Sequence, residues 1–251
     1  MKKTILLFSA LLIFGNLSAQ DKAALVNPII GTNGMGHTFP GACVPFGLVQ
    51  LSPDTDTIPH NVDGKYQPRA YEYCAGYQHK DSSIVGFSHT HFSGTGHSDL
   101  GDILIMPATG ELKLNPGTAT DPDGGYRSRF SHDTEVSRPG YYEVMLADYG
   151  VKAQLTATKR VGVHKYTFPK EAKNQRIILD MIHGIYNYDG KVLWTNIRVE
   201  NDTLVTGYRI TNGWARTNYT YFAISLSQPI KNYGYCLLYT SPSPRDRQKS
   251  R

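Results

Sequence analysis

Short alternations of apolar and polar residues, separated by turn residues, run through most of this sequence. Val151–Ala157 (VKAQLTA) and Gly162–Phe168 (GVHKYTF) both show the two-residue period of a half-buried β-strand. Turn residues such as Asn212-Gly213 separate these segments, and no convincing amphipathic helix exceeds two turns. Regular short strands without βαβ spacing predict a mainly β fold, an antiparallel β-sandwich.

Other segments extend this pattern. Ser128–Thr134 and Tyr141–Leu146 are expected to form hairpin arms around the Pro139-Gly140 turn, and Pro107 is expected to end the preceding strand. Within Gly162–Phe168, the alternation predicts that His164 and Tyr166 share one face. Further strands are expected at Phe46–Leu51, Ile103–Met106, Arg176–Met181, Val192–Glu200, Thr203–Ile210 and Tyr219–Ser227.

The N-terminus has the pattern of a secretory signal peptide. Lys2 and Lys3 precede the apolar run Ile5–Phe14, and Leu17–Ala19 offers small residues for cleavage. The run is too short to span a bilayer, although a membrane anchor is the alternative. We therefore expect residues 1–19 to be removed and the protein to be periplasmic or secreted. No Cys follows the cleavage point to accept a lipid, and no other stretch is expected to span a membrane.

The formal charge of +5 lies at the two ends of the chain. Lys2 and Lys3 contribute +2 and residues 236–251 contribute +3, so residues 21–235 are neutral. Nucleic-acid binding needs clustered cations, so nucleic acid is not expected as a partner.

The last residues, Cys236–Arg251 (CLLYTSPSPRDRQKSR), do not continue the strand pattern. They fit a disordered basic tail. They also resemble translated sequencing-adapter read-through, and we favour this hypothesis. The natural gene would then continue beyond Tyr235.

Cys43 and Cys74 both lie in Gly-rich surroundings, and an exported chain could join them in a disulfide. The alternative is a pair of buried free thiols, and the spacing of the cysteines gives no zinc pattern.

Two segments concentrate Gly, Pro, His, Asp and aromatic residues: His37–Asp54 (HTFPGACVPFGLVQLSPD) and Gly86–Pro107 (GFSHTHFSGTGHSDLGDILIMP). Glycine lets a backbone approach a ligand closely, and the other side chains suit a polar ligand. In a strand, His89 and His91 would face one surface and could bind a ligand or a metal. Alternatively, one histidine is a buried core residue and the other is exposed.

Further candidates are His37 and Phe39, which follow a Gly-rich turn, and the segment Tyr71–Tyr77 (YEYCAGY). Aromatic rings stack on the C–H faces of sugars, although tyrosine is also common in sheets. No pair of carboxylates stands in a context that marks a catalytic acid and base, so we assign no catalytic and no metal-binding residue.

The segments 26–55 (VNPIIGTNGMGHTFPGACVPFGLVQLSPDT), 86–107, 155–169 (LTATKRVGVHKYTFP) and 212–215 (NGWA) resemble glycoside hydrolase family 92. The resemblance covers residues 25–229. It implies an exported, calcium-dependent α-mannosidase that releases mannose with inversion, with α-1,2-linked mannosides the expected substrate. The family joins an N-terminal β-sandwich to a C-terminal (α/α)₆ barrel, which carries the catalytic Glu and Asp and most calcium ligands.

On this resemblance, residues 20–235 are the N-terminal sandwich, the C-terminal catalytic domain is its partner, and the chain is inactive without it. The expected substrate-binding residues are His37, Phe39, Tyr73, Cys74, His89 and His91. Family members often carry Trp at the position of Tyr73 and a smaller residue at that of His97.

Two other functions are compatible with the sequence. A free-standing carbohydrate-binding β-sandwich would bind mannose-containing glycans without hydrolysing them. A metal-dependent hydrolase would use His89 and His91 as ligands.

Overall fold

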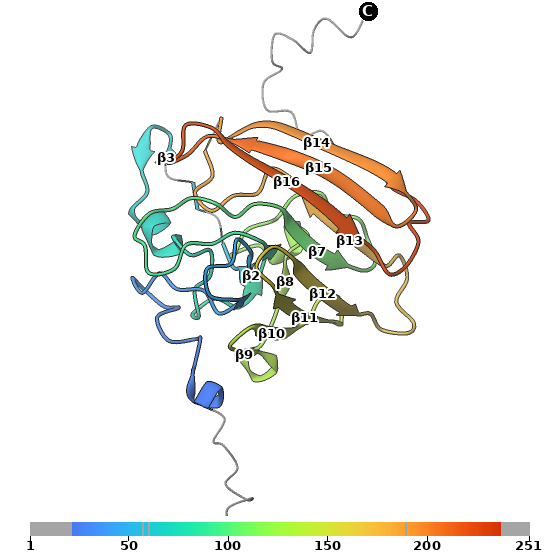
Figure 1. Ribbon diagram of the computed structural model, residues 1–251, viewed down its shortest axis with the longest axis horizontal. Helices are drawn as coiled ribbons and strands as arrows, with labels where there is room; N and C mark the ends of the chain where they lie inside the picture. The colour runs from blue at the N-terminus through green and yellow to red at the C-terminus, as the bar shows by residue number, and fades with distance from the viewer. Residues whose placement is uncertain (1–21, 57, 60, 189, 237–251) are drawn as a thin grey trace, which may run out of the picture.

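The computed structural model describes residues 22–56, 58–59, 61–188 and 190–236. The expected signal peptide and nearly all of the expected tail therefore lie outside the described residues. Within them, the fold is antiparallel β structure with four short 3₁₀ helices, none longer than six residues (Figure 1). No helix among them is long and apolar enough to cross a membrane.

Two sheets form a β-sandwich. The first has the order β1-β2-β6-β7-β13, from strands Ala42–Cys43, Gln50–Asp54, Gly86–Ser88, Leu104–Ala108 and Arg176–Asp180. The second has the order β12-β11-β10-β9, from Gly162–Thr167, Val151–Ala157, Tyr141–Leu146 and Val136–Arg138.

Alternation in the sequence decides which side chains enter the core. Every second residue of β11 is buried, including Val151, Ala153 and Leu155, and these pack with Phe87 and Met106 of the first sheet. The same period in β12 places His164 and Tyr166 on one face, as the sequence predicted; this face is partly buried, whereas Val163 and Lys165 are exposed.

A third sheet, β14-β15-β16, consists of Val192–Asn201, Leu204–Thr211 and Asn218–Ser225. It lies along one side of the sandwich (Figure 1). A large groove, lined by residues of β12, β13, β14 and β16, separates it from the sandwich. Two short pairings, β3 (Asn61–Val62) with β4 (Lys65–Tyr66) and β5 (Ser83–Ile84) with β8 (Ser128–Arg129), complete the sheets.

Three local predictions are wrong. Most of Phe46–Leu51 is a loop, because Phe46 has a left-handed backbone (φ 56°) and β2 begins only at Gln50, running to Asp54 through the residues expected to close it. Tyr141 pairs with Arg138 of β9, whereas the short β8 pairs with β5, so Ser128–Thr134 is not a hairpin arm. Strand β7 also continues through Pro107. Strand β6 pairs with β7 only at Ile105, so Pro107 lacks a neighbour on that side, where a missing N–H costs no ladder bond.

Candidate functional site

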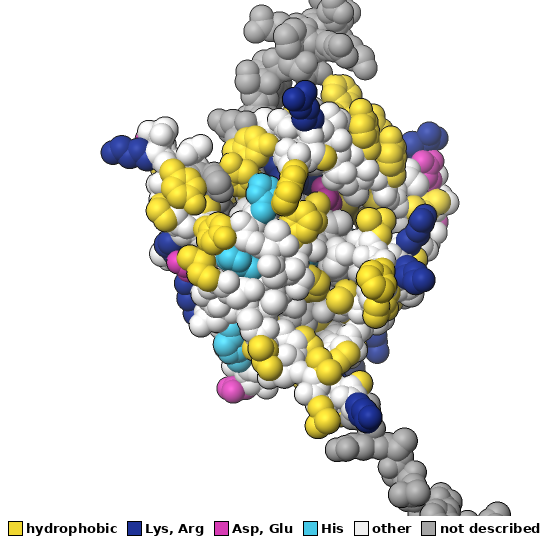
Figure 2. Space-filling model, turned by 60° about the vertical axis from the view of Figure 1, so that its left-hand side comes forward, with side chains coloured by type: hydrophobic (Ala, Val, Ile, Leu, Met, Phe, Trp, Pro, Cys, Tyr) yellow, Lys and Arg dark blue, Asp and Glu magenta, His cyan; other side chains and the backbone are white. Residues whose placement is uncertain are grey.

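The loops at one end of the sandwich gather aromatic and histidine side chains. We call His37, Tyr71, Phe92, His97 and Trp214 the aromatic–histidine face. The space-filling view of this side of the molecule shows histidines among apolar side chains (Figure 2). Trp214 is well exposed, Tyr71 is partly exposed, Phe92 and His97 are half-buried, and His37 is buried.

Glycines allow two loops of this face to approach closely. Tyr71 lies in the 3₁₀ helix η2 (Pro68–Tyr73), and its hydroxyl rests against Gly96, where a Cβ atom would lie 1.9 Å from that oxygen. The His37 carbonyl accepts a 2.6 Å hydrogen bond from the Gly94 amide, and the His37 ring meets the Tyr71 ring edge-on at 4.8 Å. His37 itself has a left-handed backbone (φ 54°), a strained conformation that recurs at binding sites.

Trp214 is the most exposed aromatic side chain of the face, at 67 %. His97 meets its indole edge-on at 4.5 Å, and Phe92 does so at 6.2 Å. An exposed indole held by its neighbours offers an apolar surface with a polar rim, the arrangement that suits the C–H face of a sugar.

Buried ion pairs support Trp214 from behind. The Trp214 backbone N–H donates a 2.9 Å hydrogen bond to Asp99 Oδ2, and the ammonium of the buried Lys191 bonds Asp99 Oδ1. Gly213 makes this approach possible, since a Cβ atom there would lie 2.5 Å from the Asp99 carboxylate. Arg209, also fully buried, places its Nε 3.4 Å from Asp102 Oδ1.

Asp54 in β2 is the centre of a second buried cluster. His91 Nε2 lies 2.8 Å from Asp54 Oδ1, and His183 Nε2 lies 2.7 Å from Asp54 Oδ2. The other His91 nitrogen, Nδ1, lies 2.7 Å from the carbonyl oxygen of Gln50. The Ser88 hydroxyl also lies 3.1 Å from His91 Nε2, so both ring nitrogens of this buried histidine have partners.

Electrostatics keep these carboxylates ionised. Burial raises the pKa of Asp54, but the charges and hydrogen bonds of His91 and His183 outweigh it, and the pKa is lowered far below its usual range. The pKa of Asp99 is likewise lowered, because hydrogen bonds from Lys191 and the Trp214 amide outweigh burial. A general acid needs the opposite shift, so neither group can donate a proton to a leaving group near neutral pH.

Five of the six residues expected to bind substrate lie in or directly beneath this region. All five are buried: His37 lies just beneath the exposed rings of the face, and Phe39, Tyr73, Cys74 and His91 lie deeper or beside it. The Phe39 ring packs 5.3 Å from His91.

Tyr73 and Cys74 hold the loops below the face. The Tyr73 hydroxyl donates to Asp81 at 3.1 Å. Cys74 Sγ donates to the Tyr71 carbonyl and lies 3.1 Å from Ser98 Oγ. These contacts support the positions of Tyr71 and the 93–98 loop.

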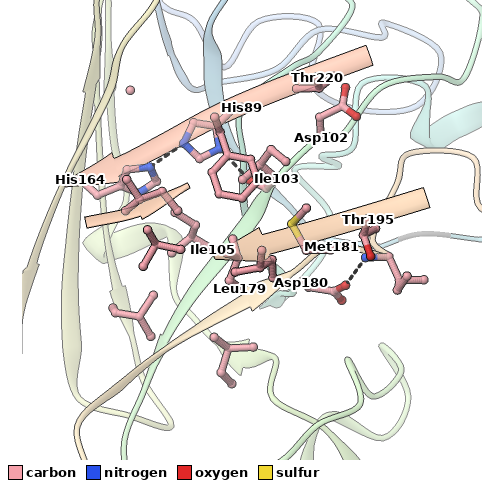
Figure 3. A pocket seen from close by; sticks show the side chains of 18 of the residues that line it. His89, Asp102, Ile103, Ile105, His164, Leu179, Asp180, Met181, Thr195 and Thr220 are labelled. Atoms are coloured by element: carbon pink, nitrogen blue, oxygen red, sulfur yellow. Dashed lines mark hydrogen bonds between the residues drawn. The ribbon is translucent and has the colours of Figure 1, made fainter. Parts of the chain in front are cut away.

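His89, the sixth residue, belongs to a different environment. Strand β6 ends at Ser88, so His89 and His91 do not share a strand face, which corrects the sequence expectation. His89 Nε2 lies 3.0 Å from His164 Nε2 and its Nδ1 lies 2.6 Å from the Ile103 carbonyl, at the groove below β14–β16 (Figure 3). All four ring nitrogens of His89 and His91 have protein partners, and the two rings converge on no common point for a metal.

The cysteines decide between the two alternatives left open by the sequence. Cys43 and Cys74 are free thiols, and so is the exposed Cys236. The alternative of two free thiols is therefore correct, but only Cys74 is buried as that alternative expected, because Cys43 is partly exposed in β1.

Three residues of this region, Trp214, Lys191 and Arg209, were not expected from the sequence. Trp214 could have been noticed as a tryptophan after an Asn-Gly turn, a position that exposes an indole. Lys191 and Arg209 give no signal in the sequence, because a buried cation is recognised only from its partners, and Asp99 is 92 residues from Lys191.

Solved structures of related enzymes share this fold. The family GH92 α-mannosidase BT3965 from Bacteroides thetaiotaomicron, solved in complex with mannoimidazole, is 44 % identical with a TM-score of 0.75, over 83 % of this chain and 26 % of that chain. The inverting mannosidase BT2199 from the same organism is 29 % identical with a TM-score of 0.58, over 79 % of this chain and 24 % of that chain.

A curated relative from Arthroderma benhamiae, described as an uncharacterized secreted glycosidase, is 30 % identical over 59 % of this chain and 18 % of its own length. The chain thus spans about a quarter or less of these relatives. The model of the glycosyl hydrolase family 92 N-terminal domain matches residues 25–251. This chain therefore belongs to glycoside hydrolase family 92 and carries that family's N-terminal domain.

Proposed function

We propose that this chain is the substrate-facing N-terminal domain of an exported exo-α-mannosidase that hydrolyses α-linked mannosides, α-1,2 linkages in particular, with inversion. The family membership and the relatives named as α-mannosidases support the reaction class. The observation that carries the proposal is the aromatic–histidine face, where the exposed indole of Trp214 is held in place beside histidine side chains. A terminal mannose of a glycan would stack on this face.

The carboxylates of this chain support a model in which one domain binds the sugar and another supplies the catalytic acid and base. Inverting hydrolysis needs a protonated acid and an ionised base with carboxyl groups roughly 6.5–9.5 Å apart. Asp54 and Asp99 lie beneath the face, but their lowered pKa values and fixed partners make them supports for the loops. In the proposal, the acid and base therefore come from a C-terminal catalytic domain, and this chain alone binds sugar without cleaving it.

Calcium is part of the proposed whole enzyme but does not fit the residues described by the structure. Calcium takes six to eight oxygen ligands. The oxygens of Asp54 and Asp99 bond histidine, lysine and backbone donors, and the converging metal-ligating group found among the described residues contains two histidines and one carboxylate. The proposal places the calcium ligands in the catalytic domain.

Export is also part of the proposal. The N-terminal pattern of residues 1–19 and the relative described as secreted support a periplasmic or secreted enzyme. A mannose-containing glycan outside the cytoplasm is then its substrate.

An assay with aryl α-mannosides and calcium tests the division of labour. The chain is expected to give no turnover above that of a heat-denatured sample, because it supplies no acid. Turnover well above that background would contradict the proposal.

A free-standing carbohydrate-binding module is the second candidate, favoured by the fact that the aromatic–histidine face lies wholly on this chain. Calorimetry with mannose and mannobiose separates the two. A half-site that needs a second domain binds at about millimolar Kd, whereas a complete binding module would bind at least tenfold more tightly.

A further inference from the structure

Three metal-ligating side chains converge at a place that the proposed sugar site does not use. The ligand atoms of His79, His132 and Glu135 all lie within 4.8 Å of one another. We propose that these residues bind a divalent transition-metal ion, zinc being the ion of choice, which clamps two segments of the sandwich edge together.

Local structure sets His132 and Glu135 on the same side of a turn. The 3₁₀ helix η4 (His132–Thr134) begins after Ser131, whose side chain accepts a 3.2 Å hydrogen bond from the Asp133 amide. The Glu135 amide then bonds the His132 carbonyl at 3.1 Å, which brings His132 Nδ1 to 2.6 Å from Glu135 Oε2.

The Glu135 carboxylate is held before any ion arrives. Its side chain is only 3 % exposed. The Tyr77 hydroxyl lies 2.9 and 3.0 Å from its two oxygens, and the Tyr142 hydroxyl donates to Oε1 at 2.6 Å. Outer partners of this kind fix a ligating carboxylate and strengthen metal binding, so Oε2 remains directed at the histidines.

The two imidazoles are ordered yet open to solvent. The His79 and His132 rings stack with centroids 4.0 Å apart, and Phe130 meets His132 edge-on at 5.0 Å. His79 Nδ1 lies 3.5 Å from the Tyr77 hydroxyl, so both Nδ1 atoms face the carboxylate side. His132 is 38 % exposed and can turn to reach the separation of about 3.3 Å between ligands of tetrahedral zinc.

The donor set selects the metal. Two imidazoles and one carboxylate suit zinc, cobalt or nickel, whereas calcium requires oxygen ligands. Water would take the remaining position. The ion would link the segment that carries His79 to the turn that carries Glu135, and so stabilise the folded state by binding it preferentially.

Titration calorimetry with zinc, on the chain purified without a polyhistidine tag, tests the site. We expect one zinc ion per chain. H79N and H132N should each weaken binding by more than about 100-fold, and Tyr142→Phe by about tenfold, since it removes only an outer partner. His97→Asn, which removes a half-buried histidine in edge-on contact with an aromatic ring, is the control and should bind zinc like the wild type.

Melting curves without metal establish that each variant is folded. The visible spectrum of the cobalt-loaded wild type shows which kinds of ligand hold the ion, without relying on any variant. The proposal is overturned by zinc binding that is absent below millimolar concentration, or that is unchanged in both H79N and H132N. A cobalt–thiolate charge-transfer band would assign the ion to a cysteine and would overturn it as well.

Discussion

Arg209 and Lys191 are basic side chains without contact with solvent, and each has a carboxylate beside it. Arg209 also donates to the His183 carbonyl, and His183 in turn bonds Asp54. Ion pairs and hydrogen bonds therefore link these charged groups to one another beneath the aromatic–histidine face. Because a buried charge without a partner is very costly, these residues fix the loops that carry Trp214 and His97.

Replacement of Arg209 tests whether its buried ion pair stabilises the fold. Arg209→Met should lower the free energy of unfolding by about 3–5 kcal/mol, because it leaves Asp102 buried without its cation. Arg198→Met is the matched control: Arg198 is 74 % exposed and pairs with Glu200 at 3.1 Å, so its loss should cost less than about 1 kcal/mol. Urea unfolding of both variants measures the difference. Equal losses would contradict the role assigned to Arg209.

At this scale, the sequence predicted which residues belong to the region of the site, but not what each of them does there. Phe39, Cys74 and His91 were expected to touch substrate, and the structure places them beneath the surface as supports. The reason is physical: burial depends on partners that are distant in sequence, such as His183, which is 129 residues from Asp54. His37 is buried as well, but its ring contacts the partly exposed Tyr71 edge-on, so it lies closest to the surface cluster.

At the scale of elements, β12 is joined to the loop after β6 by a chain of hydrogen bonds. The His89 Nδ1–H donates to the Ile103 carbonyl, which leaves His89 Nε2 to accept from His164 Nε2–H. His164 Nδ1 then accepts from the Tyr166 hydroxyl at 2.7 Å. This arrangement requires both histidines to be neutral. Burial is the main cause of their lowered pKa values, which agrees with that requirement.

The lowered pKa values predict a pH dependence of stability. Above the unfolded pKa of about 6.5 both histidines are neutral in both states, and their contribution is fully present. As the pH falls below about 6.5, the unfolded chain takes up protons that the folded chain excludes. The free energy of unfolding then falls by about 1.4 kcal/mol per pH unit for each histidine, down to the folded pKa.

Urea unfolding between pH 8 and pH 5 measures this slope. The double variant H89Q/H164Q should have a flatter pH profile than the wild type, even where its absolute stability is lower. Parallel profiles for the two proteins would rule out the neutral histidine pair as the cause.

Most strands could be predicted from alternation alone, and β11 was predicted at both ends. The exceptions were sites where local signals mislead. Pro107 would end a strand only where its missing N–H is needed, and β7 has no neighbour on its β6 side at that residue. Pairing of β8 with β5 joins segments 44 residues apart, which periodicity cannot reveal.

At the scale of the whole molecule, the β-sandwich followed from the sequence, but the position of the β14–β16 sheet did not. Alternation shows that a strand has two faces, not which surface each face meets. Several large apolar side chains along the intervening groove remain exposed, among them Leu193, Trp194 and Tyr221. Exposed apolar surface on this scale is typical of a protein interface, which agrees with a domain that works with a partner.

The sequence contains two tryptophans, which lie in different parts of the structure. Trp214 belongs to the aromatic–histidine face, whereas Trp194 lines the groove. The most direct test is therefore an NMR titration of the two indole N–H signals with methyl α-mannoside, assigned with Trp194→Phe. We predict that the Trp214 signal shifts with saturation at millimolar concentration while the Trp194 signal stays in place. A titration that moves neither signal, or that moves Trp194 alone, would contradict the account.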